Sequence, residues 1–328
     1  MKVEVHDRLE TVGAAAWEAL HARTHLRSPF LTWTWQRDWV EALGGGRRLE
    51  VWGVSDDDGR LLALLPLHEA EPGLLQPVGG TDVSDYLDLI AADGREREAW
   101  DALLEARAGS RSVWELHAVP AASPTLAALA ALAPARGLDV TVGVEERCPV
   151  LALPATWEAY LQSLTGKQRH ELARKTRRLE REAPGSGATS VAAPEALAER
   201  LDEFLDLHRR SRTGKARFMD AMMEAFFRRA VASLAARGGA RLWFLDTPEG
   251  PVASFITLEW DGTVGLYNSG FHPDRAALAP GIVLLGYLVR DAIERGMRRF
   301  DFLRGEERYK YDFGPVAEDV HLVRLAPA

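Results

Sequence analysis

Residues 278–314 read LAPGIVLLGYLVRDAIERGMRRFDFLRGEERYKYDFG, and this stretch decides the fold. It predicts a turn, a helix, a short buried strand and a polar loop. Pro280 suits the first helical turn because its missing N–H would have no partner there, and Gly296 suits the end of the helix. Leucine, isoleucine and valine recur between them at helical spacing, so we expect one wide face of the helix to be buried.

The start of this helix predicts an anion site. Unpaired backbone N–H groups and the positive end of the helix dipole point out of the turn, and Gly281 allows a ligand to approach the backbone closely. We therefore predict that a phosphate or diphosphate binds at Ala279, Pro280, Gly281, Ile282 and Val283. The alternative is an ordinary helix start, since helix N-termini are far more numerous than phosphate sites.

The polar loop after the strand is dense in reactive side chains. It carries Arg304, Tyr309 and Lys310 behind the strand that contains Asp301 and Phe302. A strand that ends beside a helix N-terminus is a common place for a site in an α/β protein. We expect a site here, and the alternative is a solvated loop.

The same stretch resembles the C-terminal end of the acetyltransferase domain of CelD-type proteins of cellulose biosynthesis. These belong to the GNAT (GCN5-related N-acetyltransferase) superfamily and are related to the Fem-type aminoacyltransferases of peptidoglycan. The resemblance rests on Pro-Gly before the helix, Asp-Phe-x-x-Gly after it and Tyr-Lys-Tyr-x-x-Gly beyond, and it extends to residues 31–39, 84–88 and 163–167. It implies an α/β (α+β) fold of tandem GNAT-like domains, each a mixed twisted sheet flanked by helices.

The residues themselves also show a repeat. Residues 49–118 and 241–303 follow one order of hairpin, third strand, helix and strand, with the third strand of the first copy expected at 86–91. We predict a domain over 1–147 and a second over 148–328. The first copy has acidic residues at its helix entrance, which repel phosphate. We therefore assign the acyl donor to the second half, and substrate binding and scaffolding, with Tyr86 as a candidate contact, to the first.

Acyl transfer from a thioester to an amine needs placement, proton transfer and stabilisation of the oxyanion, and it needs no nucleophile on the protein. The GNAT resemblance implies that acetyl-CoA or another acyl-CoA is the co-substrate, and that strands containing Phe271 and Phe302 separate to admit its pantetheine arm. Lys310 matches the lysine that serves the transfer site in the Fem-type pattern Phe-Lys-x-x-Phe-Gly. Tyr309 is a candidate proton donor to the leaving thiolate. The candidate bases, left unranked, are Glu259, Asp301 and Asp312.

A basic helix is predicted at residues 167–182, KQRHELARKTRRLERE, with seven Lys or Arg against three Glu. It is either a solvated face or a contact for a phosphate-rich partner such as the nucleotide end of coenzyme A or tRNA. Arg169, in its first turn, is our favoured phosphate contact, and Arg304 is a further candidate. Residues 211–215, predicted as a polar loop, could cover the acceptor site.

Composition narrows the class of protein. The 328 residues carry a net charge of −8, which argues against a dedicated nucleic-acid-binding protein. Cys148 is the only cysteine, so no internal disulfide and no thiolate metal cluster can form, and we predict no metal site. The N-terminal residues lack the apolar core of a signal peptide and no stretch is long enough to span a membrane, which predicts a cytoplasmic protein.

Three functions remain open on the sequence. The first is an acyl-CoA-dependent N-acyltransferase acting on an amino group of a small metabolite, sugar or amino acid. The second is an aminoacyl-tRNA-dependent transferase of the Fem type, although the sequence lacks a pair of long charged heptad helices for the tRNA. The third is a non-catalytic scaffold that binds CoA.

Overall fold

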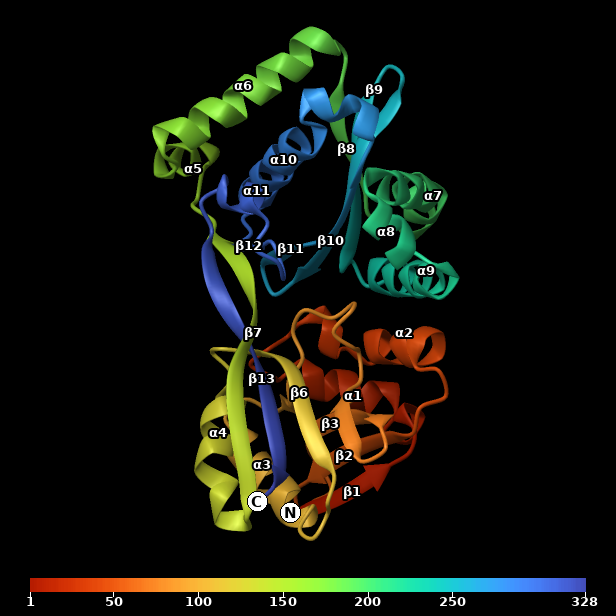
Figure 1. The fold of residues 1–328 in the computed structure, drawn as a ribbon, viewed down its shortest axis with the longest axis vertical. Coiled ribbons are helices and arrows are strands. Elements are labelled where there is room, and N and C mark those ends of the chain that lie inside the picture. The colour runs from red at the N-terminus through yellow and green to blue at the C-terminus, as the bar shows by residue number, and fades with distance from the viewer. The chain divides into compact units, whose positions relative to one another are not determined.

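The computed structural model describes residues 1–328, which form two compact units. The first unit comprises Met1–Arg147 and Glu318–Ala328, and the second comprises Cys148–Ala317. We expected the second half to run to residue 328. Instead its last segment joins the first unit, because β13 (Val316–Pro327) pairs antiparallel with β6 (Val113–Pro120), as Figure 1 shows.

The first unit is a mixed sheet covered by helices. Its strand order is β1-β2-β3-β4-β6-β13, antiparallel except for the parallel pair β4 and β6. A core of tryptophan, leucine and valine lies between this sheet and the helices α3 and α4. Its elements are β1 (Lys2–His6), α1 (Ala14–His21), α2 (Trp33–Leu43), β2 (Leu49–Ser55), β3 (Leu61–Glu71), β4 (Leu74–Pro77), β5 (Ile90–Ala91), α3 (Glu96–Ala106), β6, α4 (Pro124–Leu132) and the start of β7 (Leu138–Ala152).

The second unit repeats this plan. Its strand order is β8-β9-β10-β11-β12-β7, antiparallel except for the parallel pair β11 and β12. Helix α10 packs on one face of β9 to β11, and α7 and α9 pack on the other (Figure 1). Its elements are α5 (Trp157–Ser163), α6 (Gly166–Glu182), β8 (Gly187–Val191), α7 (Pro194–Ser211), α8 (Thr213–Phe218), α9 (Ala221–Ala235), β9 (Ala240–Thr247), β10 (Gly250–Trp260), β11 (Thr263–Phe271), the 3₁₀ helix η4 (Pro273–Leu278), α10 (Pro280–Glu294), β12 (Arg299–Asp301) and α11 (Arg308–Tyr311).

The predicted mixed α/β architecture with two similar sheets is therefore confirmed, and some elements differ. In the first unit the third strand is the short β4, whereas residues 86–91 contribute only the two-residue β5. Residues 86–89 are buried like a core strand, but they do not pair as one. In the second unit the predicted polar loops differ from the structure, because the short helix α8 begins within residues 211–215 and α11 lies within residues 304–312.

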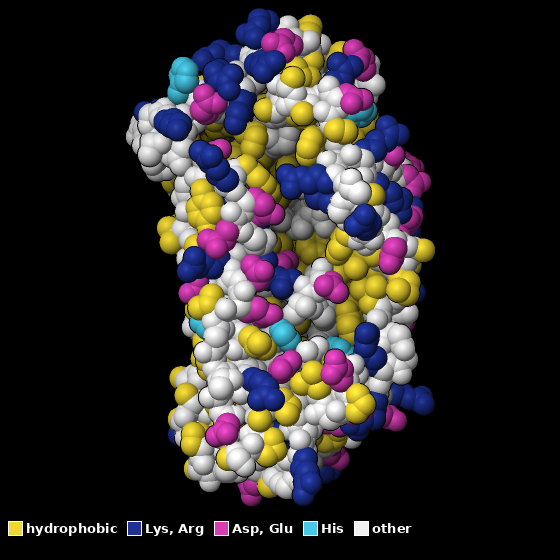
Figure 2. Space-filling view, in the orientation of Figure 1, with side chains coloured by type: hydrophobic (Ala, Val, Ile, Leu, Met, Phe, Trp, Pro, Cys, Tyr) yellow, Lys and Arg dark blue, Asp and Glu magenta, His cyan; other side chains and the backbone are white.

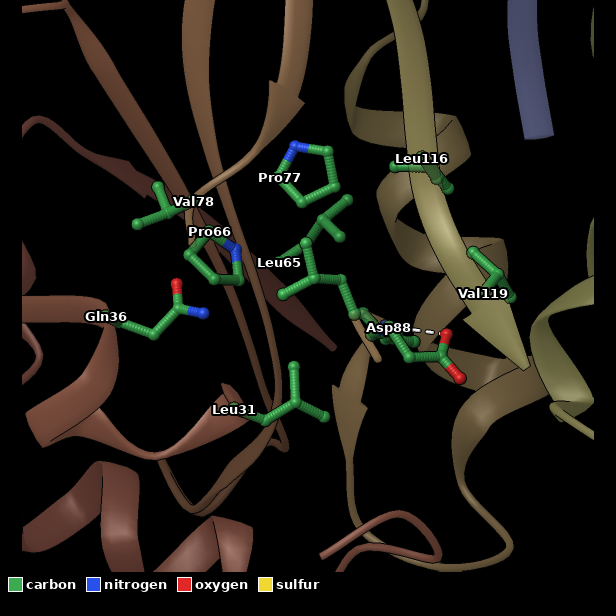
Figure 3. A pocket seen from close by; sticks show the side chains of 11 residues that line it. Leu31, Gln36, Leu65, Pro66, Pro77, Val78, Asp88, Leu116 and Val119 are labelled. Carbon is green, nitrogen blue, oxygen red and sulfur yellow. Dashed lines mark hydrogen bonds between the residues drawn. The ribbon is translucent and has the colours of Figure 1, made fainter. Parts of the chain in front are cut away.

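The parallel strands of the first unit enclose a small cavity. It measures about 10 Å³, so it holds at most about one water molecule, and Leu65, Leu116 and Val119 are among the side chains around it (Figure 3). Leu87 also lines it, and the Leu87 N–H donates to the Ala118 carbonyl at 3.1 Å, so this segment occupies the edge of β6 that β4 leaves. None of the helices is long and apolar enough to span a bilayer.

Candidate active site in the second unit

In the second unit the parallel strands β11 and β12 pair over a short segment and then separate. They pair in parallel from Thr263–Arg299 to Gly265–Asp301, where β12 ends, while β11 continues to Phe271. The pairing of β10 with β11 shifts between Ile256 and Thr257, which leaves Tyr267 as the extra residue of a β-bulge. The far half of β11 therefore has one edge that is not paired with a neighbouring strand.

The two phenylalanines predicted beside this separation differ in position. Phe271 is half-buried at the end of β11. Phe302 is 1% exposed, lies edge-on to Phe300 with ring centroids 5.1 Å apart, and donates its N–H to the Pro149 carbonyl at 2.9 Å. Phe302 therefore belongs to the core of the unit.

The start of α10 offers one free donor where five residues were predicted to bind a diphosphate. Ala279 is left-handed, with φ 51°, and its carbonyl accepts both the Ile282 and the Val283 N–H at 3.1 Å. The Ala279 N–H donates to Ala276, and Pro280 has no N–H. Gly281 keeps an N–H without a protein acceptor, and a Cβ built on it would meet only Phe255, at 3.9 Å. This position fits an anion through one N–H and the helix dipole.

Lys310 is a buried residue that shapes the loop after β12. Its side chain is 4% exposed, and Nζ donates to the carbonyls of Leu303, Arg304 and Gly305 at 3.3, 2.9 and 3.0 Å. Nζ also forms an ion pair with Glu307 Oε2 at 2.9 Å. An ammonium has three N–H groups, so these contacts occupy all of them.

Two further predicted residues support or border this loop. Asp301 is 2% exposed, and its Oδ1 accepts the N–H of Leu303, a residue with φ 55°. Burial raises the pKa of Tyr309, and the nearby Glu307 carboxylate adds to the rise. Tyr309 is therefore a phenol that keeps its proton at neutral pH, although the same rise in pKa makes it a weaker acid. Asp312 follows α11 and is exposed.

Lys215 on α8 is a site residue that the sequence reasoning did not single out. Its Nζ donates to the carbonyl of Ser269 and, at 2.9 Å, to the Ser269 hydroxyl. The Ser269 N–H donates to Asn268 Oδ1 at 2.9 Å. Both backbone groups of Ser269 therefore turn away from β10, toward the unpaired edge of β11. Burial lowers the pKa of Lys215 to about 8, with Arg212 adding to the fall and Glu307 opposing it.

The surroundings of Lys215 are charged and partly buried. Burial alone would raise the pKa of Glu307, but its ion pair with Lys310 and the charge of Lys215 outweigh burial and lower it. His208, 1% exposed, lies between Phe204 and Phe218, and its Nδ1 has no hydrogen-bond partner. Burial, with the charge of Lys215, lowers the pKa of His208 to about 3.

The polypeptide reaches this arrangement through one close contact. A Cβ on Gly270 would lie 2.4 Å from the backbone nitrogen of His208, so α7 packs directly on β11. This packing places α8, which follows α7, at the strand edge. Ser211 Oγ donates to the His208 carbonyl at 2.7 Å and does not contact its ring, so these residues form no nucleophilic triad. The only sequence signal for Lys215 was a polar segment between two amphipathic helices.

Three predicted residues lie elsewhere. Glu259 pairs with Arg241 at 3.2 Å and with Arg295 at 2.8 Å, and Arg295 follows the last residue of α10, at the opposite end from Gly281. Tyr86 is 7% exposed in the first unit, 6.4 Å from Phe30 between ring centroids. Arg169 Nη1 donates to the Leu161 carbonyl at 2.7 Å, at the end of α5.

A separate pocket lies between α5, α6 and α10. It encloses about 330 Å³, and its wall includes Trp157, Tyr287 and Val283 together with Arg169 and Arg177. Lys and Arg side chains gather over the region of α6 (Figure 2). The pocket borders the first turns of α10 through Val283 but does not include Gly281. No group of three or more His, Cys, Asp or Glu side chains is placed to hold a metal ion.

Comparisons with known proteins agree with this geometry. Residues 166–311 match the family described as Acetyltransferase (GNAT) domain. Among curated proteins, none matches the sequence of the chain. Similar solved structures include a conserved protein of unknown function from Bacteroides thetaiotaomicron VPI-5482 (14% identity, 99% of this chain and 100% of that chain, TM-score 0.65).

Two further structures are similar over most of the chain. One is FemX (12% identity, 98% of this chain and 97% of that chain, TM-score 0.64), and the other is L-PGS from Bacillus licheniformis (15% identity, 88% and 90%, TM-score 0.58). Likeness at this level of identity concerns the fold. The chain therefore has the GNAT acetyltransferase fold, and its residues 166–311 match the GNAT acetyltransferase domain.

Proposed function

We propose that the chain is a cytoplasmic acyl-CoA-dependent N-acyltransferase of the CelD-like type, acting on the amino group of a small metabolite, sugar or amino acid. One observation carries the proposal. Within the segment that matches the GNAT domain, Lys215 on α8 reaches Ser269 at the edge of β11 that pairs with no strand, and Phe255, the partner of Ser269 on β10, is the side chain nearest to Gly281 at the start of α10.

The donor site in this proposal is the start of α10 with the edge of β11. The Gly281 N–H and the helix dipole would bind the diphosphate of CoA. The unpaired edge of β11 would bind the amide groups of the pantetheine arm, as a sheet edge binds an added strand. The second unit thus takes the donor, and the first unit would contribute substrate binding and scaffolding.

The protein needs to supply only proton transfer and positioning, because a thioester is already activated toward attack by an amine. Lys215 lies beside the strand edge and has a lowered pKa, so a part of its population is neutral near pH 8. This neutral form can take a proton from a substrate amine that arrives as an ammonium ion. Tyr309 would give a proton to the leaving thiolate. Lys310 would act by positioning the loop that carries Glu307 and Tyr309, since its N–H groups are bound to that loop.

An aminoacyl-tRNA-dependent transfer of the Fem type is the second candidate. The observation in its favour is the basic helix α6, in which Lys167 and Arg177 are exposed. That helix leads into β8 and does not form a helical hairpin. Binding of charged tRNA that weakens steeply with salt would favour this candidate over acyl-CoA.

Ligand-dependent stability tests the proposal without knowledge of the acceptor. CoA at 100 times its Kd should stabilise the protein by about 2.7 kcal/mol, seen as a rise in Tm. Gly281→Glu places a carboxylate at the helix start and should abolish this rise, while Gly281→Ala, whose Cβ has room, should retain it. Both variants should melt like the wild type without ligand. A wild type that does not respond to any CoA ester would contradict the proposal, and a Gly281→Glu variant that responds fully would place the donor elsewhere.

A further inference from the structure

We propose that Lys215 is an internal acyl acceptor: when no amine substrate is present, its Nζ takes the acyl group from the bound thioester. This rests on the proposed function, because the acyl-CoA must bind along the edge of β11. It adds an activity, self-acylation at a defined residue, and a consequence, since the amide formed is stable and would alter the site.

The position of Lys215 is the first argument. Its Nζ is held by the carbonyl and hydroxyl of Ser269, on the strand edge that would bind the pantetheine arm. Phe255, the cross-strand partner of Ser269, is the side chain nearest to Gly281. A chain of neighbouring residues therefore connects the Lys215 amine, through Ser269 and Phe255, with the proposed anion site at Gly281.

The surroundings of Lys215 are the second argument. The groups that face it are Arg212 at the start of α8, His208 on α7, Glu307 before α11 and Ser269 on β11. Burial and the Arg212 charge disfavour the ammonium, so a larger share of Lys215 is a neutral amine than of an exposed lysine. A lysine activated by desolvation and a neighbouring cation is a competent nucleophile.

Lys310 provides an internal contrast. It is more deeply buried than Lys215, but four oxygen acceptors hold its ammonium. Lys215 has two acceptors, both from one residue. Lys310 should therefore stay unmodified, although it was the lysine that the sequence pointed to.

The step balances without any further reagent. Neutral Nζ attacks the thioester carbonyl, the bond from that carbon to nitrogen forms, and the bond to sulfur breaks. The nitrogen loses one proton and the thiolate gains one, so the products are acyl-Lys215 and free CoA thiol. Holding an amine beside a bound thioester raises its effective concentration far above that of a surface amine.

The chain suits a mapping experiment because its lysines are few: Lys2, Lys167, Lys175, Lys215 and Lys310. The purified protein is incubated with acetyl-CoA and no amine, and the acetylation of each lysine is followed by peptide mass spectrometry at several pH values. We expect Lys215 to be acetylated at least about 10-fold faster than exposed Lys167, with a rate that rises through about pH 8. Excess CoA should suppress this reaction at Lys215 only.

Two variants make the result decisive. Gly281→Glu should lose the preference for Lys215 while its surface lysines react as before. Lys215→Arg keeps a cation beside Ser269, should retain stabilisation by CoA, and should release no thiol above the surface background. If CoA stabilises the protein but Lys215 reacts no faster than Lys167, the inference is wrong and the proposed function stands. If CoA does not stabilise it, both fail; if Gly281→Glu keeps the preference, the inference is wrong.

Discussion

The two units open their sheets at the same point of the topology and fill the opening differently. In the first unit, β4 and β6 pair at Leu74–Val113 and Leu75–Trp114 and then separate, and Leu87 takes the freed edge by its own N–H. Apolar side chains close the space down to about 10 Å³ (Figure 3). In the second unit, the freed edge of β11 meets the ammonium of Lys215.

This difference shows how a duplicated fold can divide its tasks. An edge occupied by the chain's own backbone and sealed by leucine is part of the core. An edge that meets a half-buried ammonium, a serine hydroxyl and a nearby carboxylate is suited to chemistry. The helix entrances agree, because α3 has Glu96 and Glu98 in its first turn while α10 has no acidic residue in its first turn.

The largest effect should come from removing the buried ammonium that holds the loop of the second unit. Lys310→Met leaves three carbonyls without a donor, and we expect the free energy of unfolding to fall by about 3–5 kcal/mol in urea titrations. The partner variant Glu307→Gln, at a side chain 51% exposed, should cost no more than about 1 kcal/mol. Equal losses in the two variants would mean that the ion pair, and not the three carbonyls, holds the loop.

A somewhat smaller effect should come from the sealed opening of the first unit. Leu87 is 1% exposed beside the cavity, so Leu87→Ala should enlarge it and cost about 3 kcal/mol. The half-buried Leu74 gives a matched Leu→Ala control with a smaller loss. The Tm rise with CoA should persist in Leu87→Ala. Loss of that rise in a variant that remains folded would assign the donor to the first unit and reverse the comparison.

The smallest effect is a dependence of stability on pH that differs in sign between the units. The pKa of His208 is lowered to about 3 from 6.5, so its contribution is complete above pH 6.5 and is lost as the pH falls toward 3; at pH 5 the loss is about 2 kcal/mol. In the first unit, burial lowers the pKa of His25, but the ion pair with Asp88 at 3.5 Å and the charge of Glu96 outweigh burial and raise it. That contribution is present in acid and is lost as the pH rises through the raised pKa.

Substitution of each histidine separates the two contributions. His208→Gln should flatten the loss of unfolding free energy between pH 7 and pH 5, and His25→Gln should steepen it. The measurement is urea unfolding at each pH. If His208→Gln leaves the slope unchanged, the ring of His208 is already protonated or exposed in solution.

The sequence predicted the elements whose pattern depends on local physics. Helix α10 begins at Pro280 as predicted, and β11 spans the predicted Thr263–Phe271, because a proline, a glycine turn and a long apolar period are local signals. The anion site was predicted less well. The left-handed conformation of Ala279, which uses its carbonyl to bind two of the predicted N–H donors, is not encoded in any pattern of residue types.

The lysines show why site roles were harder to predict. Lys310 lies in a motif, and Lys215 does not, yet motifs do not reveal which ammonium is already bound. The acceptors of Lys310 are backbone carbonyls, which every residue has, and the partner of Lys215 is 54 residues away in the chain. Glu259 was a candidate base because it is a carboxylate on a strand, but its two arginine partners come from other elements.

Because Glu318–Ala328 belongs to the first unit, the two units cannot finish folding in the order in which they are synthesised. The first 147 residues leave the ribosome well before residues 318–328, so they lack the strand that pairs with β6 until β13 has emerged. The second unit ends at Ala317, so it can fold while the first unit still lacks β13 and has an unpaired sheet edge. A nascent chain stalled before β13 should therefore hold a protease-resistant second unit and a protease-sensitive first one.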